Sequence, residues 1–149
     1  MILEFREIAF GSEDYKKEVE LRYEVLRKPL GLVFDPAVLA LEGSDNHLCA
    51  FTNDHKLIAC LLMVPLAGGK VKMRQFAVDP QYQGKGVGTG LVAFAEEWSV
   101  QKGFKRIELN ARKNAVPFYL KLNYIKEGDE FIEVTIPHYF MYKNLVVGH

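Results

Sequence analysis

A glycine-dense loop between a strand-like segment and a helix-like segment constrains this chain more than any other feature. Residues Val71 to Val78 alternate in the manner of a β-strand, and Asp79-Pro80-Gln81-Tyr82 follows as a turn. The loop Gln83-Gly84-Lys85-Gly86-Val87-Gly88 then leads into an amphipathic helix. Glycines permit positive φ angles and close approach of a ligand to the backbone. Because a helix N-terminus offers unpaired N–H groups and a positive dipole end, the loop predicts a phosphate cradle.

Two other phosphate-binding loops fit the sequence less well. A Walker A loop would need glycine at position 79, where Asp79 stands. A dinucleotide fingerprint is met literally by Gly88, Gly90 and Ala93, and Glu108 lies at the distance expected for a ribose contact. Those glycines come well after the end of the strand, however, and too little chain follows Glu108 to complete a doubly wound sheet. A turn that only joins strand to helix is the remaining alternative.

Length and charge limit the classes of protein to which this chain can belong. Its 149 residues suit one domain, residues 1–149, and a hydrophobic content of 49% allows a substantial core. The 19 basic and 19 acidic residues balance, so the electrostatic footprint of a nucleic-acid-binding protein is missing. No apolar run is long enough to cross a membrane, and the charged N-terminus differs from a signal peptide. We therefore predict a cytoplasmic protein that binds neither nucleic acid nor membrane.

The cysteines and histidines predict neither a disulfide framework nor a metal site. Cys49 and Cys60 lie in apolar, strand-like segments, which indicates buried free thiols in a reducing compartment. The four histidines have no metal-ligand spacing with each other or with the cysteines. These histidines are His47, His55, His138 and His149. An enzyme without a structural metal is therefore expected.

Hydrophobic periodicity predicts the order of the other elements. Strands are expected at Ile2 to Ile8, His47 to Thr52, Lys56 to Pro65, Val71 to Val78, Arg106 to Asn110, Tyr124 to Glu130 and Val134 to Asn144. Helices are expected at Glu13 to about Arg27 with an apolar face of Tyr15, Val19, Tyr23 and Leu26, from Asp35-Pro36 toward Leu41, from Gly86 through Trp98, and at Ala115 to Leu122. The order is β-α-α-β-β-β-α-β-α-β-β. Because hairpin-linked strands precede a β-α-β crossover, this is an α/β chain with a mixed, α+β-type sheet.

The loop and a second segment resemble the GNAT superfamily of N-acetyltransferases. Gln83, Gly86 and Gly88 fill the fixed positions of its acyl-CoA pyrophosphate loop, Q/R-x-x-G-x-G/A. The segment Asn114 to Tyr124 looks like the family's N-x-x-A-x-x-[FL]-Y-x-K-x-G-[FY] pattern. The asparagine and alanine spacing is shifted here, and Asn123 replaces the usual glycine.

Two more segments are similar to a bacterial branch of small stand-alone GNAT proteins. Ile136 to Met141 looks like the I-P-H-x-x-M ending of that branch, and Leu21 to Gly31 also resembles it. The likeness covers nearly the whole chain and implies the GNAT acyl-CoA N-acyltransferase fold, with the cofactor in a V between splayed strands. It implies transfer of the acetyl group of acetyl-CoA to a small-molecule or peptide amine by direct attack in a ternary complex. Homodimers are common in this superfamily.

The resemblance also implies which residues bind acetyl-CoA. The pyrophosphate is expected to meet the backbone N–H groups of Gln83, Gly84, Lys85, Gly86, Val87, Gly88 and Thr89. The pantetheine amides are expected to pair with the strand edge at Phe76, Ala77 and Val78. Lys85 either meets a phosphate or is a solvated loop lysine. Asn114 either contacts the pantetheine arm or only caps the helix that follows.

Tyr119 is the one residue to which the resemblance assigns a catalytic step. In the family this tyrosine points at the CoA sulfur and serves as general acid. Its spacing to Ala115 and Leu122 also allows a core-packing tyrosine. The first helical region overhangs the acceptor site in the family, so Arg22 and Arg27 are candidates to meet an anionic acceptor.

The general base is not fixed by the sequence. The candidates, each of which has an alternative structural role, are Glu42, Asp45, His47, Glu108, Glu133 and His138. Neither cysteine is well placed for an acyl-enzyme relay. The rival interpretation is a non-catalytic CoA-binding or regulatory module on the same fold.

Overall fold

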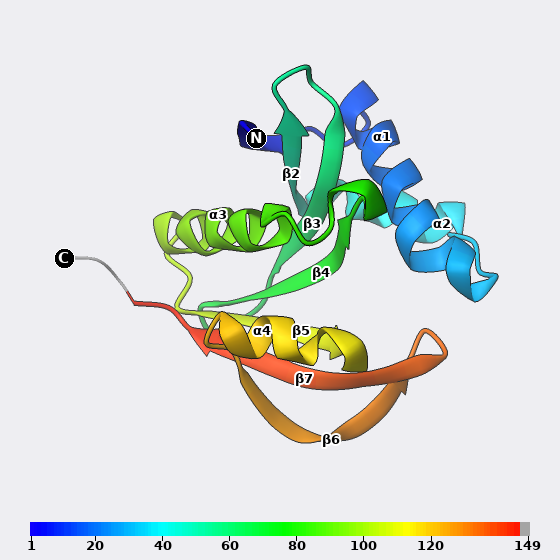
Figure 1. The fold of residues 1–149 in the computed structure, drawn as a ribbon. Helices are drawn as coiled ribbons and strands as arrows, with labels where there is room; N and C mark the ends of the chain where they lie inside the picture. Colours follow the sequence, from blue (N-terminus) through cyan, green and yellow to red (C-terminus); the bar gives the residue numbers. More distant parts are fainter. Residues whose placement is uncertain (147–149) are drawn as a thin grey trace.

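The computed structural model describes residues 1–146, which contain a seven-stranded sheet flanked by helices (Figure 1). The strands are β1 (Leu3–Ile8), β2 (Asn46–Thr52), β3 (Leu57–Pro65), β4 (Lys70–Val78), β5 (Arg106–Arg112), β6 (Ile125–Glu133) and β7 (Ile136–Asn144). The helices are α1 (Glu13–Arg22), α2 (Pro36–Leu39), α3 (Val87–Gln101) and α4 (Val116–Lys121). The predicted element order and mixed sheet are confirmed. His149 lies outside the described residues.

The sheet order is β1-β2-β3-β4-β5-β7-β6, and the pairing of β4 with β5 is parallel whereas the other pairs are antiparallel. The parallel pairing is short: it runs only from Lys70 opposite Arg106 to Met73 opposite Leu109. Gln75 then has a φ of 55°, and the β3–β4 register shifts nearby. Beyond this irregularity β4 and β5 run apart (Figure 1). The strands therefore open into a V, as the resemblance implied.

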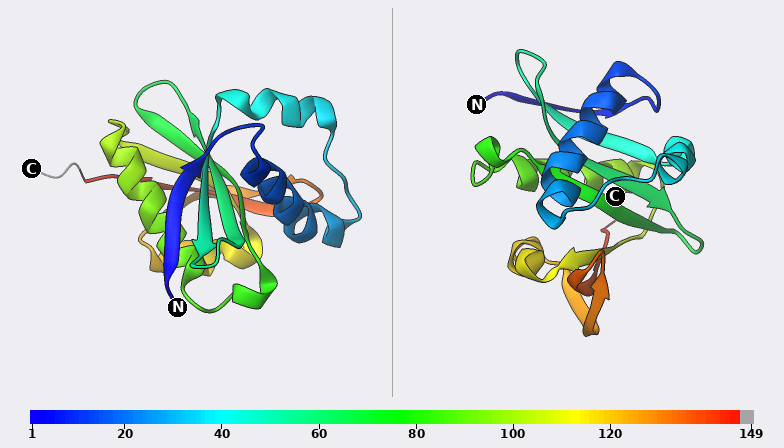
Figure 2. Two further views of the ribbon diagram at one scale, coloured as in Figure 1. Left: turned by 90° about the horizontal axis from the view of Figure 1, so that it is seen from above. Right: turned by 90° about the vertical axis from the view of Figure 1, so that its right-hand side faces the viewer.

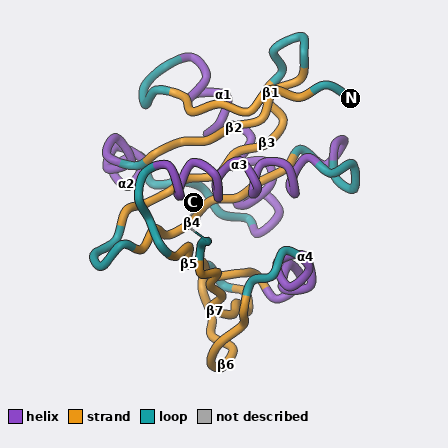
Figure 3. Tube along the Cα trace, turned by 90° about the vertical axis from the view of Figure 1, so that its left-hand side faces the viewer, coloured by secondary structure: helices purple, strands orange, loops and turns teal. Residues whose placement is uncertain are grey.

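Two apolar cores lie on opposite faces of the sheet. The larger core contains buried residues of α3 and α4, including Leu91, Trp98 and Val116. The smaller core is covered by α1 and the turn after it, which contribute Tyr15 and Leu26. Figure 2 shows α1 and α3 on opposite sides of the N-terminal strands, and Figure 3 shows α4 beside β5, β6 and β7. A cavity between β4 and β5 can therefore be reached by residues from both faces.

The first helix is shorter than predicted, and its buried face is different. After Arg22 the chain continues as a π-helical turn, Tyr23–Arg27, and as a 3-10 turn that ends at Gly31 with a φ of 70°. Glu18 and Arg22 are fully buried, whereas Val19 is only partly buried. The predicted apolar face is only part of the buried face: Tyr15 and Leu26 pack in the smaller core, but the buried ion pair of Glu18 and Arg22 was not predicted.

The last hairpin also differs from prediction. β6 continues to Glu133, and Val134 and Thr135 form the turn with φ values of 50° and 66°. A two-residue hairpin link of this kind needs positive φ at both positions, so the predicted strand start at Val134 was wrong. The longer β6 brings Glu133 next to the opening of the V. No helix within residues 1–146 is long and apolar enough to span a membrane.

Candidate active site

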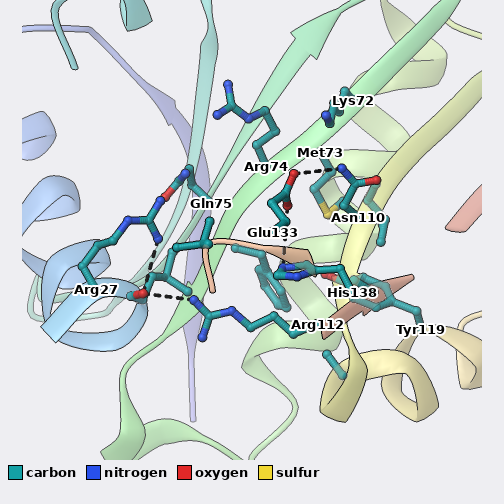
Figure 4. Close-up of a pocket in the computed structure, with 16 residues that line it drawn as sticks. Arg27, Lys72, Met73, Arg74, Gln75, Asn110, Arg112, Tyr119, Glu133 and His138 are labelled. Carbon is teal, nitrogen blue, oxygen red and sulfur yellow. Dashed lines mark hydrogen bonds and ion pairs between the residues drawn. The ribbon is translucent and has the colours of Figure 1, made fainter. Parts of the chain in front are cut away.

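A cavity of about 320 Å³ lies where β4 and β5 diverge (Figure 4). Its walls come from β4 and β5, from the π-helical turn after α1, from α4 with the turn before it, and from the β6–β7 hairpin. Tyr119 enters from the α4 face of the sheet, while Leu26 and Arg27 enter from the α1 face. The cavity therefore joins the two faces through the V.

Tyr119 packs in the core and at the same time lines the cavity. Its ring packs edge-on against Phe118 and Tyr124, with ring centroids 5.1 and 5.5 Å apart. The side chain is only 5% exposed and lines the cavity. Within the described residues its hydroxyl makes no protein hydrogen bond. Burial raises the pKa of this hydroxyl above its ordinary value, so it stays a proton donor well into the alkaline range.

The glycine loop reaches the N-terminus of α3 through residues with positive φ. Gly84 and Gly86 have φ values of 75° and 81°, and Gly86 is the N-cap of α3. The first helical bond runs from the Gly90 N–H to the Gly86 carbonyl at 3.0 Å. None of the backbone N–H groups from Gln83 to Thr89 donates to an acceptor in the described part of the chain. These donors are the groups that an anion at a helix N-terminus would accept from.

The side chains of the loop hold it against β4. The Gln83 amide donates to the Val78 carbonyl at 3.0 Å, while Lys85 is exposed and lies 5.8 Å from the Tyr82 ring. A Cβ added to Gly88 would lie 3.1 Å from Cζ of Phe76. Glycine at position 88 therefore permits the close contact between α3 and β4.

The predicted strand edge is not paired with β5, although the Val78 carbonyl already accepts from the Gln83 side-chain amide. Ala77 and Val78 pair with Cys60 and Ala59 of β3, but the β5 pairing has already ended at Met73. The ring of Phe76 stacks on Phe118 of α4 with centroids 5.7 Å apart. The backbone of residues 76–78 therefore lies between the glycine loop and the cavity, with one edge unpaired by β5.

Asn114 does not cap α4, so that alternative was wrong. It lies exposed in the 3-10 turn Lys113–Ala115, and the N-cap residue is Ala115 with no side-chain cap bond. A capping side chain requires extended backbone at the N-cap, whereas Ala115 already has helical angles of −95° and −9°. Asn114 is also absent from the lining of the cavity.

Two of the six candidate bases, Glu133 and His138, line the cavity. His138 is 4% exposed, and its Nδ1 lies 2.9 Å from the Ile136 carbonyl oxygen. A carbonyl only accepts, so Nδ1 carries the proton and Nε2 of the neutral ring carries the lone pair. That Nε2 lies 3.6 Å from a Glu133 carboxylate oxygen, whose partner oxygen accepts from the Asn110 amide at 3.2 Å (Figure 4).

The other candidate bases lie elsewhere, and Glu42 and His47 belong to a buried ionic network. Arg22 donates to both oxygens of Glu42 at 2.8 and 2.7 Å and to Glu18 at 3.1 Å. His47 faces Glu18 through Nδ1 and the Glu42 carbonyl through Nε2, both at 3.0 Å. Burial is the largest single effect and opposes charge on His47, but the hydrogen bonds to Glu18 and to the Glu42 carbonyl, together with both negative charges, outweigh it and raise the pKa. Arg22 therefore has its anion partners inside the protein, and its predicted contact with an acceptor was wrong.

Five cavity residues with polar side chains were not anticipated from the sequence, namely Lys72, Arg74, Gln75, Asn110 and Arg112. Asn110 and Arg112 occupy alternate positions on β5, and Gln75 occupies the irregular position on β4. The alternation of β5 could have placed Asn110 and Arg112 on one face. Nothing local indicated that this face borders the V.

Comparison with known proteins identifies the class and then the family. A protein from Lactobacillus plantarum, 22% identical, superposes with a TM-score of 0.85 over 98% of this chain and 100% of its own. The PaiA N-acetyltransferase from Thermoplasma acidophilum, solved in complex with coenzyme A, is 18% identical and has a TM-score of 0.74 over 97% and 99% of the two chains. The fold is that of the acyl-CoA N-acyltransferases.

Sequence comparison adds the family. A model of the acetyltransferase (GNAT) family matches residues 7–124. The uncharacterized N-acetyltransferase YjcF of Bacillus subtilis is 27% identical over 138 residues, which cover 92% of this chain and 97% of YjcF. The chain therefore belongs to the GNAT family of acetyltransferases.

Proposed function

We propose that this protein transfers the acetyl group of acetyl-CoA to a primary amine of a small molecule or peptide, by direct attack in a ternary complex. One observation carries the proposal. A single cavity joins the α4 face, where Tyr119 lies, to the α1 face, where Leu26 and Arg27 lie, and His138 and Glu133 also line it. A donor thioester and an amine could therefore meet between a proton donor and a base.

The residues around the loop fit the donor. The pyrophosphate would accept from backbone N–H groups of residues 83–89, and the pantetheine amides would pair along the free edge of residues 76–78. Lys85 is exposed near the loop and adds positive charge there, while Asn114 lies just beyond the cavity and is retained as a proposed pantetheine contact. The glycine at position 88 keeps side-chain bulk out of this path.

The proposed chemistry uses proton transfers at both ends of the cavity. An ammonium acceptor loses a proton to Nε2 of His138, and the neutral amine forms a C–N bond with the acetyl carbon. The C–S bond of the thioester breaks, and the Tyr119 hydroxyl donates its proton to the departing thiolate. The nitrogen releases its second proton to solvent as the amide forms, and the Tyr119 oxygen and His138 return to their starting protonation states by exchange with solvent. Glu133 stabilises the imidazolium that forms. Direct attack is favoured because Cys49 and Cys60 are buried outside the cavity, and burial raises the pKa of both thiols.

Acetyl-CoA turnover with a panel of amines tests the proposal. Release of free thiol together with a mass increase of the acceptor is the expected result. Calorimetry should also detect binding of CoA and of desulfo-CoA, and pantetheine should bind much more weakly. If CoA binds tightly but no amine in a broad panel is acetylated, the protein is a CoA-binding module and the catalytic proposal is wrong.

A further inference from the structure

Two arginine side chains from segments far apart in the sequence meet at the cavity. Arg27, on the π-helical turn, donates through Nη1 to the Leu26 carbonyl oxygen at 3.3 Å. Arg112, at the end of β5, donates through Nη2 to the same oxygen at 3.0 Å (Figure 4). Both residues line the cavity. Two positively charged side chains therefore donate to one neutral carbonyl oxygen, that of Leu26.

These two guanidiniums have no carboxylate partner. Within residues 1–146 neither Arg27 nor Arg112 has an Asp or Glu oxygen within 4.0 Å, whereas Arg22 is paired with two carboxylates. Burial lowers the pKa of Arg27, and the charge on Arg112 lowers it further. Burial also lowers the pKa of Arg112. Partly buried cations that repel each other favour a bound anion.

The geometry leaves donors available for that anion. A guanidinium has five N–H donors, and the Leu26 carbonyl uses one from each arginine. The Arg27 guanidinium also lies over the Phe34 ring, 4.7 Å from its centroid, which fixes its plane. Figure 4 shows the Arg74 side chain directed away from this pair.

We propose that Arg27 and Arg112 bind a carboxylate of the acceptor, so that the preferred acceptors are small amino-acid-like amines. The inference rests on the proposed function and specifies its substrate class. The opposite charge in the same cavity is Glu133, beside His138. An acceptor with an amine at one end and a carboxylate at the other matches both groups. The lining also contains Lys72 and Arg74, so an aminoalkyl phosphate is the competing acceptor that the experiment must include.

The experiment compares acceptors that differ only in this charge. Amino acids and their carboxamides are assayed as pairs at saturating acetyl-CoA, with aminoalkyl phosphates and polyamines as further arms. A charge-assisted hydrogen bond contributes about 1.5–3 kcal/mol, so the acid should exceed its amide about 10- to 100-fold in kcat/KM. Equal use of acid and amide, or a preference for the phosphate or the polyamine, would overturn the proposal.

Variants assign the preference to the two arginines. Arg27→Gln and Arg112→Gln should raise KM for the acid about 10- to 100-fold and leave KM for the amide and for acetyl-CoA within about threefold. Arg106→Gln is the matched control, since Arg106 also lies on β5 but outside the cavity. If the two variants weaken acid and amide equally, the arginines only cap the Leu26 carbonyl. If the variants do not fold, the comparison of kcat/KM for amino acids and their carboxamides with the parent protein decides whether the carboxylate is recognised.

A binding measurement separates this inference from the proposed function. N-acetyl amino acids and their amides are titrated by calorimetry into the parent protein saturated with CoA. Selective binding of the acid that Arg112→Gln abolishes supports the carboxylate site even if no turnover is found. Turnover of amines without any such selectivity supports the proposed function and rejects the carboxylate site.

Discussion

Replacement of Tyr119 by phenylalanine tests the general-acid step with little disturbance of the fold. The ring packs against Phe118 and Tyr124, and phenylalanine keeps those contacts. The hydroxyl makes no hydrogen bond within the described residues, so its loss should change the free energy of unfolding by less than about 1 kcal/mol. Any large effect of Tyr119→Phe must therefore appear in the reaction.

The size of that effect follows from the bond that is lost. One donor to a thiolate contributes about 1.5–3 kcal/mol, and a thiol of ordinary pKa near 8.5 leaves tolerably without help. We expect kcat to fall on the order of 10²-fold, the low end for general acid catalysis, with acetyl-CoA affinity little changed. Because burial raises the pKa of Tyr119, the parent protein should have no descending limb from this group up to about pH 10.

The assay is thiol release across pH at saturating acetyl-CoA, with Tyr124→Phe as the control. Tyr124 touches the Tyr119 ring but donates to Glu96 at 3.0 Å and is absent from the cavity lining. The control should therefore lose stability and keep kcat. If Tyr119→Phe turns over at the parental rate, Tyr119 is a packing residue and other groups stabilise the thiolate.

Three further outcomes are expected. Gly88→Val adds a side chain 3.1 Å from Phe76 and should weaken CoA binding by calorimetry at least about tenfold while the far-UV spectrum stays native; unchanged affinity would move the site. His138→Gln should lower kcat about 10²- to 10⁴-fold with acetyl-CoA affinity unchanged, and a parental kcat would eliminate it as the base. The raised folded-state pKa of His47 means that its stabilisation is full below about pH 6.5 and is lost as the pH rises through that pKa. In urea unfolding from pH 6 to 9, the difference in free energy of unfolding between the parent protein and His47→Gln should therefore shrink as the pH rises. A difference that stays constant would contradict a positively charged His47.

The strand–loop–helix unit on which the proposed donor side rests could be predicted from the sequence because it is local. The spacing of Gln83, Gly86 and Gly88 belongs to one strand–loop–helix unit, and such a unit places its backbone N–H groups at the helix N-terminus wherever it occurs. The free edge of β4 follows from the same unit once β5 diverges. Asn114 was misassigned as a cap because the side-chain type favours caps, whereas the 3-10 turn before α4 already has helical backbone angles.

The acceptor side could not be predicted because it is assembled from distant parts of the chain. Arg112 and Leu26 are 86 residues apart in sequence, and they meet only because β5 diverges from β4 and a π-helical turn follows α1. The hairpin turn at Val134 and Thr135 sets how far Glu133 extends toward the cavity. A residue-by-residue pattern contains neither the strand divergence nor the extra helical turn.

Arg22 and Arg27 belong to one segment but have different surroundings. Arg22 is enclosed by Glu18 and Glu42, and removal of one partner from such a buried pair costs about 3–5 kcal/mol. Arg27 follows five residues later, at the end of the π-helical turn. It lies outside that network and lines the cavity. Selection for folding would keep the carboxylates around Arg22, whereas a carboxylate placed beside Arg27 would compete with a bound anion. Within residues 1–146 neither Arg27 nor Arg112 has a carboxylate partner, and the proposed carboxylate site accounts for this whereas the fold does not require it.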